Sequence, residues 1–248
     1  MPGIGMLNET ELHEQLKHLY AGAEGETEQV VEGFVVDVVR DGELIEIQTR
    51  GFGKMRRKLV ALSATHRVRI VHPIATETVI TKLSDTGEIH SSRRSPRKGR
   101  MEEIYREIVS IADLLPHENI AVEAVMVRVV ETRIDDGKGS WRRRGVSIVA
   151  RQLGAVDGTH RFTSAKDYLH VLPSSLEGEF TNADLIRETG LRYRHAQPIT
   201  SSLRKMGLVR LAGKRGREQL YEITKPRRRQ KSSRSKPRRI GPGTSNSR

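Results

Sequence analysis

The spacing of apolar residues changes several times along the chain, and each change marks an expected element. Three leucines at helical spacing predict a helix over residues 9–21, and the acidic, glycine-containing stretch after it is interpreted as a loop or a frayed helix end. Two β-rich runs then meet at Asp41-Gly42, a dipeptide that strongly favours a two-residue hairpin turn. The first part of the chain is therefore expected to be a helix followed by a β-hairpin.

Further elements follow at short intervals. Gly51 and Gly53 punctuate a turn, after which a second helix is expected. A short apolar stretch predicts a buried strand that ends near Pro73, because proline interrupts a strand ladder. Residues 76–89 suggest another hairpin, and residues 91–100, rich in Ser, Arg and Lys, are interpreted as a connector.

The second half of the chain begins with the same mixture of helix and strand. Residues 101–115 have the pattern of one amphipathic helix, and two long β-like runs follow at 120–134 and 145–156, joined by a polar loop. After Pro173 the pattern becomes helix, helix and β-hairpin. We expect an α/β protein with a mixed-sheet core and a small second domain.

Boundaries follow from these patterns. The front α/β domain is assigned to residues 1–172, and the second domain to 173–225. Within the front domain we distinguish a core (9–90), a connector (91–100), and an accessory helix with a β-hairpin (101–172). Residues 226–248 are expected to be a disordered basic tail, because they contain too little apolar surface to bury.

The first hairpin carries the candidate chemistry. A two-residue turn at Asp41-Gly42 would pair Arg40 with Glu43 and would bring Asp37 opposite Glu46 on one face. Gln48 would share that face, because side chains repeat every two residues along a strand. The opposite face would then be a core face with these apolar residues: Phe34, Val36, Val38, Ile45 and Ile47.

Opposed carboxylates repel each other, so something must offset their charge. Solvent exposure, a shared proton and a divalent cation would each do so. Paired carboxylates are ligands that suit Mg²⁺ (or Mn²⁺), which takes oxygen ligands and retains several waters. An ordinary solvated strand face has the same spacing, so the pattern alone leaves both interpretations open.

Amino-acid composition excludes several classes of site and of protein. There are no cysteines, which excludes a disulfide scaffold, a thiolate zinc site and a cysteine nucleophile. No apolar run is long enough to span a bilayer, and the first residues have the features of neither a signal nor a transit peptide. The net charge is +13, but ten Lys and Arg and no acid lie in residues 225–248, which leaves about +3 elsewhere. Such a tail favours contact with a phosphate backbone.

The front of the chain resembles the PD-(D/E)XK nuclease superfamily. The resemblance covers residues 9–75, through ELHEQLKHLY, VVDVV, LIEIQT, GKMRRKLVAL and HRVRIVHP. It implies a restriction-endonuclease-like core in which Asp37 and Glu46 bind metal and Glu14 is the first-helix acid. Gln48 stands where the family has lysine, and Lys54 or Lys58 on the following helix would supply an ammonium in the same space.

Residues 181–224 resemble the winged helix-turn-helix family. Thr181 or Asn182 would cap the first helix and Gly190 would end it. Pro198 is expected in the first turn of the second helix. The resemblance implies DNA contacts from the second helix and from a basic hairpin tip, at Arg194, His195, Gln197, Ser201, Arg204, Lys205, Lys214, Arg215 and Arg217.

Together these features predict a Mg²⁺-dependent DNA endonuclease, or a nuclease-derived DNA-processing protein, positioned by a winged helix. The alternative is a non-catalytic DNA-binding transcriptional regulator with a degenerate nuclease-like domain. In either case we expect a cytoplasmic protein, nucleoid-associated in a prokaryote, with DNA and no membrane as its partner. A homodimer is left open by the sequence.

Overall fold

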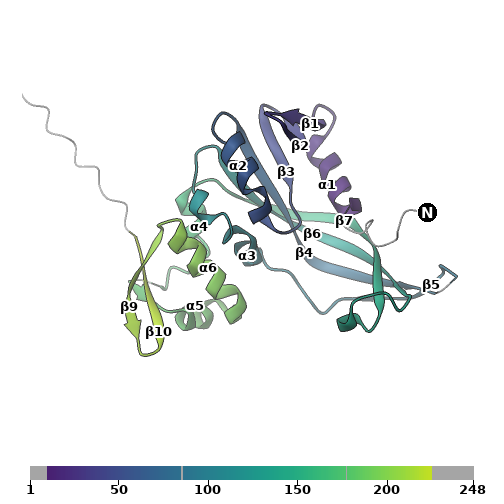
Figure 1. Ribbon diagram of the computed structural model, residues 1–248. Coiled ribbons are helices and arrows are strands. Elements are labelled where there is room, and N and C mark those ends of the chain that lie inside the picture. Colours follow the sequence, from purple (N-terminus) through teal and green to yellow (C-terminus); the bar gives the residue numbers. More distant parts are fainter. Residues whose placement is uncertain (1–9, 85, 177, 225–248) are drawn as a thin grey trace, which may run out of the picture.

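One large mixed sheet forms the centre of the molecule (Figure 1). The computed structural model describes residues 10–84, 86–176 and 178–224. The strands run in the order β1-β2-β3-β4-β6-β7, with β5 paired to β4. Pairs β3–β4 and β4–β6 are parallel and the others antiparallel. Its strands are β1 (Glu26–Val31), β2 (Phe34–Arg40), β3 (Glu43–Ile47), β4 (Arg67–Leu83), β5 (Ile89–Arg94), β6 (Ile120–Asp135) and β7 (Val146–Phe162). The expected mixed α/β class is confirmed.

Helices cover both faces of this sheet. Leu12 and Leu16 of α1 (Thr10–Ala21) pack with Val71 and Val125 on one face. On the other face, a larger apolar cluster joins the sheet to the remaining helices of the front part. These helices are η1 (Phe52–Met55), α2 (Arg56–Leu62), η2 (Met101–Ile104), α3 (Tyr105–Ile108) and η3 (Ala112–Leu114), while η4 (Trp141–Arg143) lies in the loop between β6 and β7.

A compact unit follows β7 and packs against the front part through α6 and α3 (Figure 1). Its strands form a separate three-stranded sheet in the order β8-β10-β9. Its elements are α4 (Ala165–Leu169), β8 (Glu179–Phe180), α5 (Asn182–Thr189), α6 (Tyr193–Lys205), β9 (Val209–Arg215) and β10 (Glu218–Ile223).

Several expected elements are confirmed. The first helix, the Asp41-Gly42 hairpin, the helix after Gly53 and the long β6–β7 hairpin all form. Asp41 and Gly42 have φ of 51° and 68°, as a two-residue turn of this kind requires. Thr181 caps α5 in a reciprocal capping box with Asp184, and Gly190 ends α5 with φ of 64°.

Other boundaries were wrong. Strand β1 begins within the acidic stretch expected to be a loop, and the first four residues of the expected connector 91–100 belong to strand β5. The buried strand does not end near Pro73 but continues to Leu83. The Val71 carbonyl accepts a hydrogen bond from the Gln48 N–H, so the backbone polar groups of Val71 face β3. Pro73, two residues later, faces the same side, but β3 has already ended there. Proline is tolerated there because no partner strand needs the backbone N–H that proline lacks.

The helix expected over residues 101–115 is broken into three short segments. Its apolar residues are buried as predicted, but α3 ends at Ile108. The Ser110 hydroxyl donates to the Glu107 carbonyl at 2.8 Å and competes for a helical acceptor. Ile111 then leaves the helical region with φ of −127°.

The expected core face of the first hairpin is also divided between two faces. Phe34 and Val36 pack with the cluster under α2, whereas Val38, Ile45 and Ile47 pack with the cluster under α1. The change of face falls at Asp37, where the pairing of β1 with β2 is distorted by Glu28, with φ of 56°. A distortion of this kind redirects a side chain that would otherwise lie in the regular alternation.

Two further expectations concern the chain ends and Pro198. Pro198 lies inside α6 rather than in its first turn, because this helix already begins at Tyr193. The basic tail at 226–248 lies outside the described residues. In the part of the chain that the structure describes, no helix has the length and apolar composition needed to cross a bilayer.

Candidate active site

The candidate site lies where β2 and β3 cease to pair. Their register runs from Arg40–Glu43 at the turn to Val38–Ile45, as predicted. One step further, the carboxylate of Asp37 accepts a hydrogen bond from the Ile47 backbone N–H at 2.8 Å. The Asp37 side chain thus binds a backbone N–H of the neighbouring strand β3, and this hydrogen bond holds the carboxylate at the gap.

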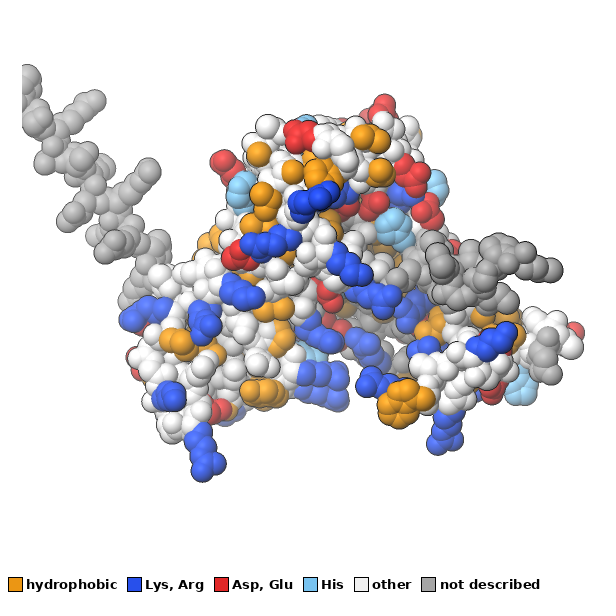
Figure 2. Space-filling model, viewed as in Figure 1, with side chains coloured by type: hydrophobic (Ala, Val, Ile, Leu, Met, Phe, Trp, Pro, Cys, Tyr) orange, Lys and Arg blue, Asp and Glu red, His pale blue; other side chains and the backbone are white. Residues whose placement is uncertain are grey.

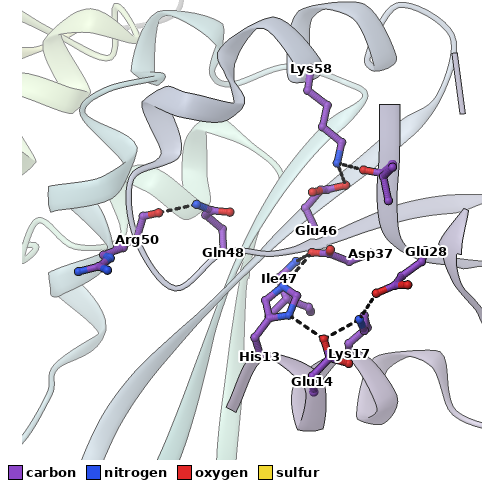
Figure 3. A network of polar contacts seen from close by, with 11 residues as sticks. His13, Glu14, Lys17, Glu28, Asp37, Glu46, Ile47, Gln48, Arg50 and Lys58 are labelled. Atoms are coloured by element: carbon purple, nitrogen blue, oxygen red, sulfur yellow. Dashed lines mark hydrogen bonds and ion pairs between the residues drawn. The ribbon is translucent and has the colours of Figure 1, made fainter. Parts of the chain in front are cut away.

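Asp37 also contacts helix α1 (Figure 3). His13 Nε2 lies 3.3 Å from Asp37 Oδ2. Burial raises the pKa of Asp37, but the His13 hydrogen bond, the Ile47 N–H and the charge of Lys58 outweigh it and leave that pKa below its ordinary value. The Asp37 hydrogen bond raises the pKa of His13 against the opposing effect of burial. Asp37 is therefore the ionised member of the acid pair.

The Glu46 side chain is more deeply buried than that of Asp37, and it is contacted from the α2 face of the sheet (Figure 3). Lys58 of α2 forms an ion pair with Glu46 and also donates to the Val35 carbonyl. Burial, helped by the charge of Asp37, outweighs the contact with Lys58 and raises the pKa of Glu46 to about 7. Near neutral pH, Glu46 is consequently about half protonated.

The two acids were expected on one face, and this is corrected by the structure. Glu46 meets α2 and Asp37 meets α1, because the regular alternation of β2 is broken at Asp37. The charge of Asp37 nevertheless raises the pKa of Glu46 across the gap. Neighbouring carboxylates with different pKa values are common in functional sites.

The first-helix acid, Glu14, lies 3.7 Å from His13 Nδ1 rather than against Asp37. Glu14 is 45% exposed and accepts from Lys17 at 2.7 Å, and the buried Lys17 also binds Glu28 at 2.8 Å. The α1 residue that contacts Asp37 is His13, which sequence reasoning missed. Helical spacing places both His13 and Glu14 near the sheet, but the rotation of the helix about its axis decides which one reaches Asp37.

The structure distinguishes the two candidate lysines, Lys54 and Lys58. Lys58 reaches Glu46, whereas Lys54 lies exposed on η1. Gln48 directs its amide nitrogen to the Arg50 carbonyl, away from Glu46 (Figure 3). Among the described residues no group of three or more His, Asp or Glu side chains surrounds one point. Asp37 and Glu46 supply two carboxylates from neighbouring strands, directed to different helices. Mg²⁺ is often held by one or two carboxylates with waters and phosphate oxygens, which is the most that these two acids could offer it.

Comparison with known proteins places the front part of the chain in a family. A family model described as "Domain of unknown function (DUF8091)" matches residues 10–163, well over half of the chain. The protein belongs to this family. It is also 33% identical over 225 residues to an "Uncharacterized protein" of Treponema pallidum (strain Nichols), a match that covers 90% of this chain and 88% of the relative. No solved structure shows significant similarity.

The DUF8091 match contains the whole acid site and ends one residue after β7. The domain boundary that we predicted after residue 172 lies further along, beyond α4. The match to the Treponema relative extends over most of this chain, so it takes in sequence beyond the DUF8091 region.

The predicted DNA-binding residues of α6 divide into two groups. Arg194, Gln197 and Arg204 are exposed and Ser201 is half-buried. His195 was predicted to face outward, but it is buried and accepts from Arg194 at 2.9 Å. This flank of α6 packs against the DUF8091 region, which explains the correction.

Two contacts on the same flank join α6 to α3. Lys205 donates to the Val109 carbonyl at 2.7 Å, and Ser202 donates to the Tyr105 carbonyl. Lys205 is exposed although its ammonium is engaged. The face of α6 that remains open is consequently narrower than the sequence suggested.

The hairpin tip between β9 and β10 is basic and exposed. Lys214 and Arg217 lie at or beside the turn. Arg215 is 56% exposed but forms an ion pair with Asp184 of the α5 capping box at 2.8 Å. This contact ties the tip to α5 and leaves Lys214 and Arg217 as its outward charges.

Proposed function

We propose that the protein is a metal-dependent nuclease that acts on DNA. The observation that carries the proposal is the pair formed by Asp37 and the buried Glu46, with Lys58 beside them, at the gap between β2 and β3. Metal-dependent hydrolysis of a phosphodiester uses a bound cation, an activated water and positive charge near the phosphate. The pair offers the carboxylates for the first requirement and Lys58 offers charge for the last.

The order of elements favours the same proposal. A helix, an antiparallel hairpin, a second helix and a parallel strand carry the acids and lysine in the order of the PD-(D/E)XK family that the sequence resembles. Lys58 comes from the second helix, where we expected a displaced lysine to replace the one missing at Gln48.

Each group has a distinct role in the proposed chemistry. Asp37 and Glu46 would hold Mg²⁺ or Mn²⁺, which when bound supplies an acidic water and neutralises phosphate charge. His13 keeps the Asp37 carboxylate oriented and ionised. Lys58 would stabilise charge on the phosphate, and loss of the Glu46 proton would accompany binding of the cation.

The C-terminal unit is proposed to position the enzyme as a winged helix. Its order of α4, β8, α5, α6 and the β9–β10 hairpin, with sheet order β8-β10-β9, favours this interpretation. The exposed Arg194, Gln197 and Arg204 of α6 are the residues proposed to contact DNA. Lys214 and Arg217 would add phosphate contacts from the hairpin.

A second candidate function is favoured by two contacts at the same site. The Gln48 side-chain amide donates to the Arg50 backbone carbonyl, and the Lys58 ammonium already offsets the charge of Glu46. A site of this kind is stable without a cation. The alternative is therefore a non-catalytic DNA-binding regulator that retains the fold.

Cleavage of DNA distinguishes the two functions. Asp37→Asn and Glu46→Gln should each abolish Mg²⁺-dependent nicking of plasmid DNA while DNA affinity changes less than about threefold, because phosphate contacts lie elsewhere. Asp41→Asn is the matched control, since it removes an exposed carboxylate of the same hairpin at a position where Asn tolerates positive φ. Cleavage by both site variants at the parental rate would reject the assigned site, and an inactive parent would favour the regulator.

A further inference from the structure

A basic cavity opens beside the acid site on the concave side of the long strands. It has a volume of about 430 Å³ and begins at Leu12, Thr49 and Arg50, next to the ends of α1 and β3. Figure 2 shows Lys and Arg side chains gathered around a hollow in the middle of this face. Six arginines from separate elements line the cavity: Arg50, Arg97, Arg106, Arg133, Arg143 and Arg151.

The charge of this lining is unbalanced. Three carboxylates, those of Glu103, Glu107 and Glu131, stand against the six guanidinium groups. Each carboxylate is already engaged by a donor of the protein: Glu131 binds both Arg133 and Arg151, Glu103 binds Arg97, and Glu107 accepts from the Gly51 N–H. The lining therefore has an excess of three positive charges, which favours a polyanion.

Part of the cavity floor is apolar. Buried Ile74 and Ile80 of β4 and Val127 and Val129 of β6 form it between the arginines. A duplex keeps its bases stacked inside and presents phosphates, so an apolar floor gives it little to bind. A single strand exposes its bases, which can lie on such a floor while the phosphates reach the arginines.

Size favours the same occupant. A volume of about 430 Å³ is in the range of pockets that hold small organic ligands, so it accommodates one or two nucleotides but not both strands of a duplex. Beside the cavity, the β6–β7 loop presents Trp141 with 83% of its surface exposed. Arg142 lies 5.6 Å over its ring, and Arg143 lines the cavity two residues later. An exposed indole next to arginines is a platform on which a base can stack.

We infer that this cavity, named here the arginine groove, binds a short segment of single-stranded DNA and leads it toward Asp37 and Glu46. The inference rests on the proposed function for the identity of the polymer, and it adds the form of DNA that the site takes. It also gives the DUF8091 region its own DNA contact, independent of the C-terminal unit.

The test is binding of a fluorescent 15-nucleotide single strand to the full-length protein, with EDTA present and at several salt concentrations. Arg106→Gln with Arg151→Gln should raise Kd about tenfold or more and reduce the slope of log K against log salt by about 1.4, because each lost phosphate contact on a single strand contributes about 0.7. Trp141→Ala should raise Kd at least about fivefold with no change in slope, since it removes stacking only.

Arg57→Gln with Arg67→Gln is the matched control, because it removes two exposed arginines that do not line the groove. Equal binding by the groove and control variants would overturn the inference, and so would a duplex that binds as tightly as the single strand and loses as much affinity in the groove variant. Binding is measured without divalent cations, so a protein that binds through the groove and never cuts would contradict the proposed nuclease and still uphold the groove.

Discussion

At the scale of residues, the site depends on two carboxyl groups in unequal surroundings. Asp37 accepts hydrogen bonds from Ile47 and His13 and has a lowered pKa. Glu46 is buried, and its pKa is raised to about 7. The difference lets one acid stay ionised while the other exchanges a proton near neutral pH, which is the behaviour expected of a site that accepts a cation.

The raised pKa of Glu46 has a consequence for stability. The folded state holds this proton more tightly than the unfolded state, whose pKa is near 4.5, so stability present below pH 4.5 is lost as pH rises through 7. Glu46→Gln should remove this loss and make the protein more stable than the parent at pH 8, by up to about 3 kcal/mol. Urea unfolding at pH 5 and pH 8 measures the difference. A variant that is less stable than the parent at pH 8 would show that burial does not dominate at Glu46.

Sequence reasoning reached part of this site. The Asp-Gly turn predicted the register of the hairpin from Arg40–Glu43 to Val38–Ile45 correctly, and Asp37 and Glu46 are the next residues of the two strands. The helical position of Lys58 also made it one of two candidates. His13 was missed and the face of Asp37 was wrong, because both depend on long-range features: the rotation of α1 and the distortion at Glu28.

At the scale of elements, local rules worked where turn and cap residues decide the backbone. Thr181 and Gly190 set the ends of α5, as predicted. The local rules failed where tertiary contacts determine the backbone. Pro73 did not end its strand because β3 has already ended beside it, so the backbone N–H that proline lacks is not needed there. Strand β1 formed from an acidic stretch because β2 offered it an edge. Strand pairing of this kind is not encoded in local propensity.

The cap of α5 can be tested directly. Thr181 accepts from the Asp184 backbone N–H while Asp184 accepts from Thr181. Thr181→Ala should lower the free energy of unfolding by about 1 kcal/mol, because a helix N–H loses its partner. Thr181→Ser keeps the hydroxyl and should recover most of that loss. Equal unfolding curves for the alanine variant and the parent would mean that the capping box does not contribute.

At the scale of the whole molecule, the DUF8091 region and the C-terminal unit share one apolar core. Ile199 and Leu203 of α6 belong to the same buried cluster as Tyr105 and Ile108 of α3. This packing leaves the arginine groove and the outward face of α6 as separate basic surfaces. The tail from residue 225 adds ten Lys and Arg.

These surfaces should contribute differently to DNA binding. Deletion of residues 226–248 removes nine of the tail charges and should weaken binding at low salt and flatten its salt dependence, because fewer counterions are released. Preference among DNA sequences should survive. Substitution of Gln197 and Arg204 by alanine should reduce that preference with a smaller change in salt slope. Anisotropy titrations with specific and random duplexes measure both. If the deletion abolishes the preference among DNA sequences and the α6 variant retains it, α6 does not recognise the DNA sequence.

Asp37 and Glu46 are proposed to hold a divalent cation together, and electron paramagnetic resonance of bound Mn²⁺ measures this binding. We predict one bound Mn²⁺ per chain, with an affinity that increases from pH 6 to pH 8 as Glu46 loses its proton. Asp37→Asn and Glu46→Gln should each abolish this binding, and Asp41→Asn should retain it. Absence of bound Mn²⁺ in the parent at pH 8, or equal binding by the parent and Asp37→Asn, would show that these two acids do not form a cation site.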